Sequence, residues 1–315
     1  MKCFDVLAVG ELNPDFILAG ISAETPQLGA EQEFKRYHLE LGSSTAISCV
    51  LMQRLGLRTA MSACVGDDDH GKFCRAALDE SGVDTGLITV VPGVATGLTV
   101  CLPYPHDRML LTAKGAMVMN PALAITPDIL RTSRHLHVGS FFLQTGLRPV
   151  LADLFATARS LGLSTSLDTG WDPDERWLSD DLRAVLAQTS YFFPNELEFE
   201  RLTETNDPDL GSAVLLALGV ETVVLKRGAS GAVAISSEGL TEHAGYLVQS
   251  IDTTGAGDAF NAGYLAAMSG GESVVEGLAF GNACGALTVS AIGGTGGVED
   301  RRQVCAFVDA NSQTV

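Results

Sequence analysis

The chain has 315 residues, of which 46% are hydrophobic and 18% charged, a composition typical of a globular protein with a large core. Its 38 acidic and 20 basic side chains give a formal net charge of -18, which disfavours nucleic acid and anionic membrane surfaces as partners. No apolar run approaches the ~20 residues that span a membrane, and no signal peptide precedes the first apolar run. Seven cysteines without a C-x-x-C pair indicate a reducing compartment, so we expect a cytoplasmic protein.

Short apolar runs alternate with amphipathic helical stretches along most of the chain. In chain order, the predicted elements are a strand at 6–9, a helix at 45–55, a strand at 59–65, a helix at 70–79, a strand at 135–138, a helix at 150–161, a strand at 163–167, a helix at 181–188, a strand at 191–193, helices at 195–202 and 214–218, a strand at 222–225, and helices at 257–269 and 273–291. Strands that alternate with helices predict a three-layer, Rossmann-like α/β fold, in which helices cover both faces of a mostly parallel sheet.

Two segments, at about residues 12–40 and 95–115, contain extended stretches with no helix between them. The second is typical of a β-hairpin with a polar turn at residues 105–108. We expect these strands to form a small β-sheet lid on one main domain, 1–315; the alternative is an edge hairpin without a role. Exposed strand edges also make the lid a candidate surface for a homodimer.

The most informative segment is the glycine-rich run at residues 252–258, Asp-Thr-Thr-Gly-Ala-Gly-Asp, which leads into a predicted helix. Gly255 and Gly257 lack β-carbons, so backbone N–H groups can surround a ligand. At a helix N-terminus those groups are unpaired and partly positive, which predicts an anion hole that needs no cluster of Lys or Arg. Asp258, beside this hole, is interpreted either as a general base toward a hydroxyl group or as a helix N-cap.

Residues 252–260, Asp-Thr-Thr-Gly-Ala-Gly-Asp-Ala-Phe, resemble without a mismatch the C-terminal signature of the ribokinase-like (PfkB) carbohydrate kinase family. The resemblance extends over nearly the whole chain. Its other motifs lie at residues 10–15, 41–46, 65–71, 194–198, 226–231 and 280–283.

This resemblance implies the ribokinase-like form of the α/β fold and an ATP-dependent kinase for the hydroxymethyl group of a small sugar or related alcohol. Asp258 would be the catalytic base, and the backbone of Gly255, Ala256 and Gly257 would hold the transferring phosphoryl group. Position matters more than base strength in this reaction, because the transition state of phosphoryl transfer is loose.

The resemblance also implies nucleotide and metal contacts. Asn195 and Glu198 would order the water shell of Mg²⁺, with Glu198 acting through water; an ordinary helix cap is the alternative. Lys226 would reach the phosphates, with a solvated surface charge as the alternative. The remaining nucleotide-binding candidates are Gly228, Gly231 and Asn282.

A monovalent-cation site is a further implication. Asp252 and Thr254 match positions that line such a site in many family members, and the loop at residues 291–297 would supply backbone carbonyl groups. The ion would be K⁺; the alternative is that the glycines of this loop only make a turn.

The residues expected to bind the acceptor are Asn13, Asp15, Gly42, Ser43, Ser44, Phe142 and Gln144. Two departures from the family concern the first signature, where Leu41 replaces a Gly and Ala46 stands where many members carry Asn. Two others, Gly170 and Asp172, replace the Asn and Arg of the sugar-acid kinase motif, so the usual clamp for an acid is missing. We therefore expect a neutral hexose or pentose; a nucleoside kinase, a sugar-acid kinase and a catalytically inactive kinase-like binding protein are the alternatives.

Overall fold

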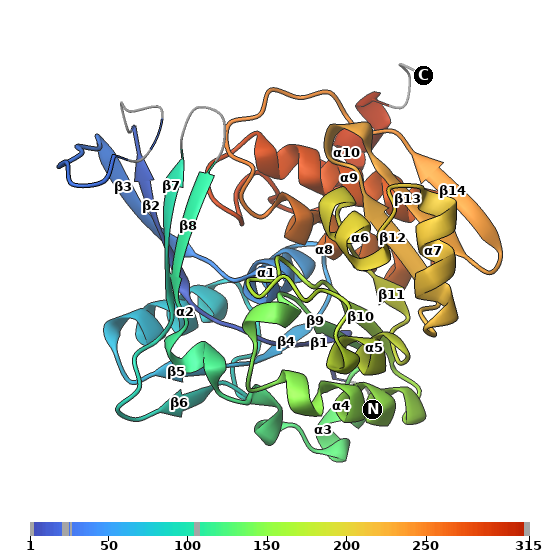
Figure 1. Cartoon of the computed structure of the whole chain (residues 1–315), viewed down its shortest axis with the longest axis horizontal. Helices are drawn as coiled ribbons and strands as arrows, with labels where there is room; N and C mark the ends of the chain where they lie inside the picture. The colour runs from blue at the N-terminus through green and yellow to red at the C-terminus, as the bar shows by residue number, and fades with distance from the viewer. Residues whose placement is uncertain (1–2, 21–24, 26, 104–107, 312–315) are drawn as a thin grey trace.

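The computed structural model describes residues 3–20, 25, 27–103 and 108–311. Eight strands of this part of the chain form one large sheet (Figure 1). Its strand order is β14-β13-β12-β11-β10-β9-β1-β4. The strands are β1 (Val6–Val9), β4 (Thr59–Ser62), β9 (His135–Val138), β10 (Ser164–Leu167), β11 (Tyr191–Phe192), β12 (Thr222–Lys226), β13 (Ala232–Ser236) and β14 (Gly239–His243). Neighbouring strands from β4 to β12 pair in parallel, whereas β13 and β14 add an antiparallel hairpin at one edge. The predicted mostly parallel sheet is confirmed; the hairpin is an addition to the predicted elements.

Helices pack on both faces of this sheet. One face is covered by α1 (Ser44–Arg54), α8 (Ala256–Gly270), α9 (Val274–Val289) and α10 (Arg301–Asn311). The other is covered by α3 (Pro127–Arg131), α4 (Arg148–Ser160), α5 (Asp180–Leu186), α6 (Glu196–Thr203) and α7 (Pro208–Ala217). Val6 of β1 packs in the first cluster and Leu7 in the second, because successive side chains of a strand point to opposite faces. The three-layer α/β arrangement predicted from the sequence is thus confirmed.

A second, four-stranded sheet stands apart from the large one, at the left in Figure 1. Its order is β3 (Arg36–Leu41), β2 (Pro14–Ala19), β7 (Leu98–Pro103) and β8 (Arg108–Ala113). These strands come from the two segments that break the helical alternation, so the expected small sheet is confirmed. Most of the predicted turn at 105–108, and residues 21–24 and 26 of the first segment, lie outside the described residues. Closure of this sheet as a lid, and a single domain over 1–315, stay predictions.

The prediction of one continuous strand at 59–65 is wrong, because the segment divides at Ala63 into two strands, β4 and β5 (Cys64–Gly66). β5 leaves the large sheet and pairs with β6 (Thr89–Val91). Every residue of the run is buried, so its apolar pattern contains no break that would mark the change of sheet. The helix that follows, α2 (Asp69–Glu80), begins after the N-cap Asp68.

Short 3₁₀ turns complete the described elements: η1 (Gly115–Val118), η2 (Pro121–Ala124), η3 (Phe141–Leu143) and η4 (Gly228–Ser230). Within the described ranges, no helix combines the length and the apolar character needed to cross a membrane. The cytoplasmic location stays a prediction.

Candidate active site

The glycine-rich segment forms the start of α8. Gly255 is the N-cap of this helix and has a left-handed backbone with φ of 73°, which favours glycine. A β-carbon at Gly255 would also collide with the backbone of Gly294. Asp258 lies within the first turn of α8, so the alternative interpretation of Asp258 as the N-cap is wrong. With no side-chain cap at Gly255, the partly positive helix start is available to an anion.

Asp258 contacts two serines of α1, the helix that follows the first signature. Ser44 Oγ donates a hydrogen bond to Asp258 Oδ1. Ser48 Oγ donates to the backbone oxygen of Asp258 at 3.2 Å. The starts of α1 and α8, which lie 214 residues apart in the chain at Ser44 and Asp258, are therefore joined at the candidate base.

Four of the predicted acceptor residues lie together where the chain enters and leaves the small sheet. Asn13 and Ser43 exchange two hydrogen bonds of 2.8 Å: the backbone N–H of Asn13 donates to Ser43 Oγ, and Ser43 Oγ donates to Asn13 Oδ1. The backbone N–H of Gly42 donates to the backbone oxygen of Asn13, and a β-carbon at Gly42 would collide with the Asp15 carboxylate. These contacts place Asp15 against the first signature, next to the start of α1.

Phe142 and Gln144 lie in the segment that follows β9, where Phe142 is in a short 3₁₀ turn and Gln144 ends it. The Phe142 ring is buried and packs edge-on against Trp177, with ring centroids 5.7 Å apart. Gln144 is also buried, and its amide donates to the backbone oxygen of Gly139. Both side chains have structural contacts that explain their burial, and their role toward an acceptor stays a prediction.

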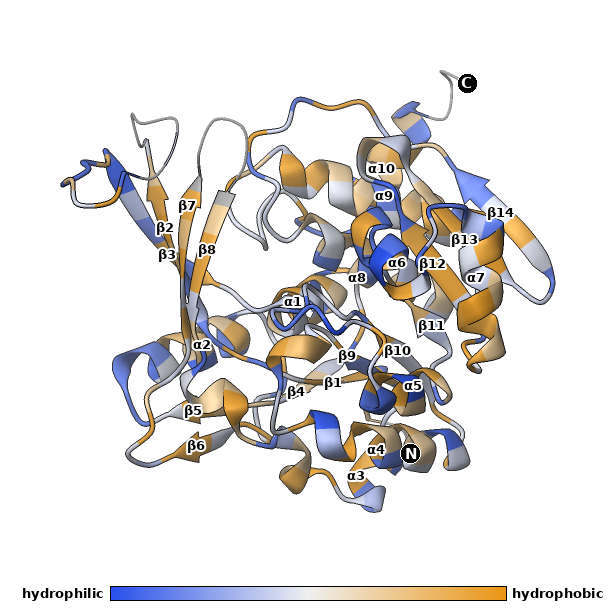
Figure 2. Ribbon diagram, in the orientation of Figure 1, coloured by the Kyte–Doolittle hydropathy of each residue, from blue (hydrophilic) through white to orange (hydrophobic). Residues whose placement is uncertain are grey.

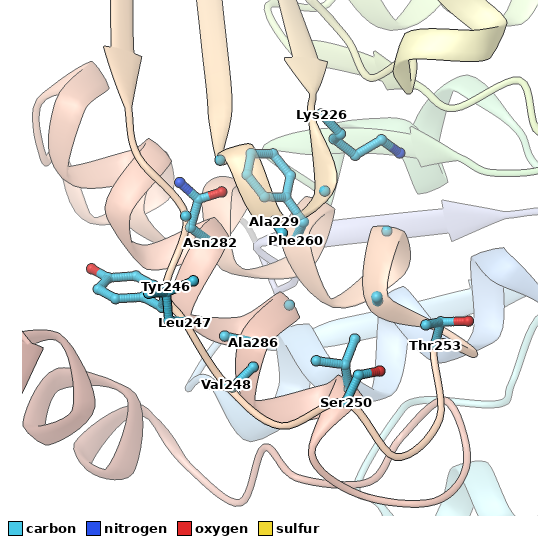
Figure 3. Close-up of a pocket in the computed structure, with 17 residues that line it drawn as sticks. Lys226, Ala229, Tyr246, Leu247, Val248, Ser250, Thr253, Phe260, Asn282 and Ala286 are labelled. Carbon is cyan, nitrogen blue, oxygen red and sulfur yellow. The ribbon is translucent and has the colours of Figure 1, made fainter.

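A cavity of about 450 Å³ opens beside the start of α8 (Figure 3). Its lining includes Ala256 and Gly257 of the glycine-rich segment together with four predicted nucleotide-binding residues: Lys226, Gly228, Gly231 and Asn282. Mostly apolar groups of residues 245–248, Ser250 and α9 contribute to its walls. The size and the apolar lining suit a small-molecule ligand.

Residues 245–248 and Ser250 line a part of this cavity that sequence reasoning missed. They follow β14 without regular structure, and Tyr246, Leu247 and Val248 line the cavity opposite Thr253 (Figure 3). Asn282 fixes the beginning of this segment, since its amide donates to the backbone oxygens of His243 and Ala244 at 3.1 and 3.3 Å. No turn motif or periodicity in the segment would have predicted this position.

Lys226 forms a buried ion pair with Asp168, a residue absent from the candidates predicted by the sequence. Lys226 Nζ lies 2.6 Å from Asp168 Oδ2, which also accepts a hydrogen bond of 2.7 Å from Asn261 of α8. Burial alone would raise the pKa of the Asp168 carboxyl, but the Lys226 charge and these hydrogen bonds hold it below its usual range. Lys226 Nζ also lies close to Gly257. The alternative of a solvated surface charge is therefore wrong for Lys226.

Asn195 and Glu198 form a capping box at the start of α6. The backbone N–H of Glu198 donates to Asn195 Oδ1 at 2.9 Å, and the backbone N–H of Asn195 donates to Glu198 Oε2 at 3.0 Å. Burial, with the nearby charge of Asp168, raises the pKa of Glu198 to about 7. The capping role is observed, and a role toward Mg²⁺ stays a prediction.

Asp252 contacts the glycine loop that the sequence paired with it. Asp252 Oδ1 accepts from the backbone N–H of Thr254 at 2.9 Å, and Oδ2 accepts from the backbone N–H of Gly293 at 3.0 Å. Arg54 holds the other end of this loop, since its guanidinium donates to the backbone oxygens of Thr295 and Val298. No group of three or more His, Cys, Asp or Glu side chains suited to a metal ion occurs among the described residues.

Glu11 is a second buried carboxylate that the sequence analysis missed. It follows β1, and its oxygens accept from the hydroxyl and the backbone N–H of Thr45, in the first turn of α1, at 2.7 and 3.3 Å. Burial, opposed by these bonds and reinforced by the charge of Asp258, raises the pKa of Glu11 to about 7. The signal in the sequence was an acidic residue directly after a buried parallel strand, where ligand sites of α/β sheets gather.

A family model described as pfkB family carbohydrate kinase matches residues 4–301. The chain belongs to this family. It is thus a carbohydrate kinase, a phosphotransferase with the ribokinase-like α/β fold.

Named relatives of this kinase align along most of its length. Ribokinase of Haemophilus influenzae is 29% identical over 311 residues, which cover 96% of this chain and 97% of the relative. ATP-dependent ribose-1-phosphate kinase of Halopiger xanaduensis is 30% identical over 288 residues, 90% of this chain and 91% of the relative. Among solved structures, an E. coli protein provisionally named ribokinase II, in complex with ATP and Mg²⁺, has a TM-score of 0.86 and 26% identity over 98% of this chain and 100% of its own.

The buried Glu11 predicts how the stability of the kinase depends on pH. Between its ordinary pKa of 4.5 and about 7, the folded chain holds a proton that the unfolded chain has released. The contribution of Glu11 to the free energy of unfolding therefore falls as pH rises, by up to about 1.4 kcal/mol per pH unit. His135 and His137 act in the opposite direction, because burial lowers their pKa to about 3 and about 4.

We expect Glu11→Gln to gain stability relative to the unsubstituted kinase as pH rises through this window, with the difference constant above about pH 7. Urea unfolding at half-unit pH steps measures the difference, and Glu238→Gln, an exposed carboxylate in the β13–β14 turn, is the control. Parallel stability curves for Glu11→Gln and the unsubstituted kinase would contradict the assignment.

Proposed function

We propose that this kinase transfers the terminal phosphoryl group of ATP, bound with Mg²⁺, to the hydroxymethyl group of a neutral hexose or pentose. The observation that carries the proposal is the position of Asp258. It directly follows the cavity-lining residues Ala256 and Gly257 in the first turn of α8, and it accepts a hydrogen bond from Ser44, the neighbour of Ser43 in the cluster around Asn13 and Asp15. One carboxylate thus lies beside both a candidate nucleotide site and a candidate acceptor site.

The nucleotide would occupy the cavity. Its apolar walls suit a purine base, and Asn282, held by two backbone oxygens, lies on the wall shared with Tyr246 (Figure 3). The phosphates would then extend toward the start of α8, where the backbone N–H groups and the buried Lys226 ammonium supply positive charge. The E. coli structure in complex with ATP and Mg²⁺ supports this choice of ligand.

Glu198 is the residue that we propose to hold Mg²⁺ through water. Its capping bond to Asn195 engages Oε2 and orients the buried carboxyl. A hard oxygen donor that acts through a retained water suits Mg²⁺, which gives up its waters reluctantly. When bound, the ion would neutralise charge on the phosphate oxygens.

The acceptor would lie under the small sheet. One face of that sheet carries a polar row, in which Asp15 pairs across the strands with Glu40 and Thr99. Carboxylates accept hydrogen bonds from sugar hydroxyls and disfavour an anionic acceptor. Asp172, which stands where sugar-acid kinases carry Arg, is buried and accepts backbone hydrogen bonds from Asp174, Arg176 and Trp177, so it organises its own loop instead of clamping an acid.

In the proposed reaction the acceptor oxygen attacks the terminal phosphorus while its proton passes to Asp258. Bond breaking to the leaving group runs ahead of bond making in the loose transition state, so the base is needed late. The N–H groups of residues 256–258 would stabilise charge on the transferring phosphoryl oxygens. Lys226, fixed by Asp168 beside Gly257, would add its charge on the same side.

We also propose that K⁺ binds between residues 252–254 and the loop at 291–297. Asp252 already joins the two segments through Thr254 and Gly293, and a β-carbon at Gly255 would collide with Gly294. An ion there would be held by backbone carbonyls and one carboxylate, the oxygen ligands that suit a hard cation. It would fix the loop that supports the glycine-rich segment.

The small sheet, in our proposal, closes as a lid over the acceptor and pairs with the lid of a second copy. Its other face carries an apolar row in register across all four strands, formed by Leu39, Phe16, Val100 and Leu111. Figure 2 shows the hydrophobic colouring along β2, β7 and β8. Leu39 and Leu111 are 36% and 49% exposed, and an apolar sheet face open to water is typical of an interaction surface.

Replacing Asp258 by Asn tests the proposed function. The amide keeps an oxygen for Ser44 but cannot accept a proton, so we expect kcat to fall by ~10²–10⁴-fold while ATP binding is retained. ADP release would be measured over hexoses, pentoses, sugar acids, sugar phosphates and nucleosides, with ATP binding measured by calorimetry. The control is Asp309→Asn on the exposed face of α10.

Near-normal turnover in Asp258→Asn would refute the assignment of the base. Activity only on sugar phosphates, sugar acids or nucleosides would overturn the neutral acceptor. No ADP release with any acceptor would favour an inactive kinase-like binding protein.

The cation proposal predicts higher kcat in K⁺ than in Na⁺ at equal ionic strength, by roughly 5-fold or more. Asp252→Asn should reduce this difference, because Asp252 links the two segments around the proposed ion. Steady-state kinetics with each chloride salt measures the effect, and equal activity in the two salts would argue against the site.

The dimer proposal predicts that the kinase sediments as a dimer and that Leu111→Glu shifts it to the monomer, because the charge would be buried between two lids. Leu240→Glu on β14 is a matched control, since Leu240 is 48% exposed and lies outside the small sheet. Sedimentation velocity distinguishes the two states, and a monomeric unsubstituted kinase would exclude the interface.

A further inference from the structure

The side chain of Ser44 carries a hydroxyl group that is already hydrogen-bonded to the proposed catalytic base, Asp258. Its Oγ donates a hydrogen bond to Asp258 Oδ1, the interaction that the hydroxyl of a sugar acceptor would need before its proton is transferred. The side chain of serine is itself a hydroxymethyl group, the chemical class of the proposed acceptor. Ser44 therefore matches the proposed acceptor in its chemical class, a hydroxymethyl group, and in its hydrogen-bond partner, Asp258.

The contact between α1 and α8 keeps Ser44 at this place. Ser48, one turn further along α1, donates a hydrogen bond to the backbone oxygen of Asp258 at 3.2 Å. The buried Glu11 accepts hydrogen bonds from the hydroxyl and the backbone N–H of Thr45. The first turn of α1 is thus held from two sides. Ser44 itself is only half-buried.

A phosphate on Ser44 would lie beside the Asp258 carboxyl group, whose negative charge opposes it when ionised, and near two helix N-termini, whose partial positive charge favours it. Ser44 is the first residue of α1, and the hydroxyl of the preceding N-cap, Ser43, is engaged with Asn13 and not with the helix. A phosphoryl group at this position would lie near the N-termini of α1 and α8, where backbone N–H groups and helix dipoles stabilise anions. Lys226 adds a buried cation beside Gly257.

We propose that Ser44 is an internal acceptor, which the kinase phosphorylates when no alcohol substrate is bound. Ser44 Oγ attacks the terminal phosphorus of ATP, the bond between that phosphorus and the bridging oxygen of the β-phosphate breaks, and ADP leaves. The proton of Ser44 passes to Asp258 Oδ1. The modified chain would be blocked, because its phosphate would occupy the anion hole and the position of the acceptor hydroxyl.

This inference rests on the proposed function, and it has a consequence for substrate dependence. A bound sugar hydroxyl and Ser44 compete for Asp258 Oδ1, so a bound acceptor protects the enzyme from self-modification. Without acceptor, the kinase would turn itself off in the presence of ATP, which would limit unproductive consumption of ATP.

The test is incubation of the full chain with radiolabelled ATP and Mg²⁺ in the absence of any acceptor. We expect incorporation to rise toward one phosphate per chain, as phosphoserine that peptide mass spectrometry maps to Ser44. Ser44→Ala should abolish the label, and Asp258→Asn should slow it by ~10²-fold or more. Ser237→Ala, which replaces an exposed serine in the β13–β14 turn, is the control and should still be labelled at Ser44.

Each outcome separates this inference from the proposed function. Sugar phosphorylation without labelling of the chain would overturn the internal acceptor and leave the kinase function intact. Label that persists in Ser44→Ala, or at an undiminished rate in Asp258→Asn, would overturn the inference as well. Neither sugar phosphorylation nor labelling would overturn both.

Discussion

The structure depends on the contact between the starts of α1 and α8, where Ser44 and Ser48 bind Asp258. α1 continues from the small sheet through the first signature, and α8 continues from the segment that lines the large cavity. The contact therefore joins the two halves of the candidate site through one carboxylate. Gly255 has a left-handed backbone and packs directly on Gly294 of the loop at residues 291–297. Gly294 in turn packs on Ile47 of α1, so the absence of β-carbons lets α8, this loop and α1 lie close together.

The candidate site contains local positive groups although the chain as a whole is strongly negative. A formal charge of -18 repels a nucleotide at long range, so binding has to come from local groups. The start of α8 supplies backbone N–H groups, and Lys226 supplies one buried cation that Asp168 fixes beside Gly257. Burial acts on each of the carboxyls Asp168, Glu11 and Glu198. Only Asp168, in direct contact with Lys226, has its pKa lowered, and the other two are raised to about 7.

The two faces of the small sheet follow from the period of two along its strands. Asp15 lies in a polar row with Glu40 and Thr99, and the next residue, Phe16, lies in an apolar row with Leu39 and Val100. A shift of one residue in register would exchange the two rows, so the pairing of β2 with β3 and β7 fixes which face carries the carboxylates. The same pairing leaves an apolar face open to water.

The sequence by itself determined the layered α/β architecture and the helix that starts in the glycine-rich segment, because buried parallel strands read as continuous apolar runs and glycine permits the left-handed backbone that precedes this helix. It did not determine the break at Ala63, where both sides of the break are equally buried. Nor did it determine the contacts of Glu11 and Asp168, or the burial of Lys226. Asp168 and Lys226 come from separate strands and meet because parallel strands end at the same edge of a sheet. Glu11 follows a third strand and meets Thr45 of α1, so in neither case does a local pattern connect the partners.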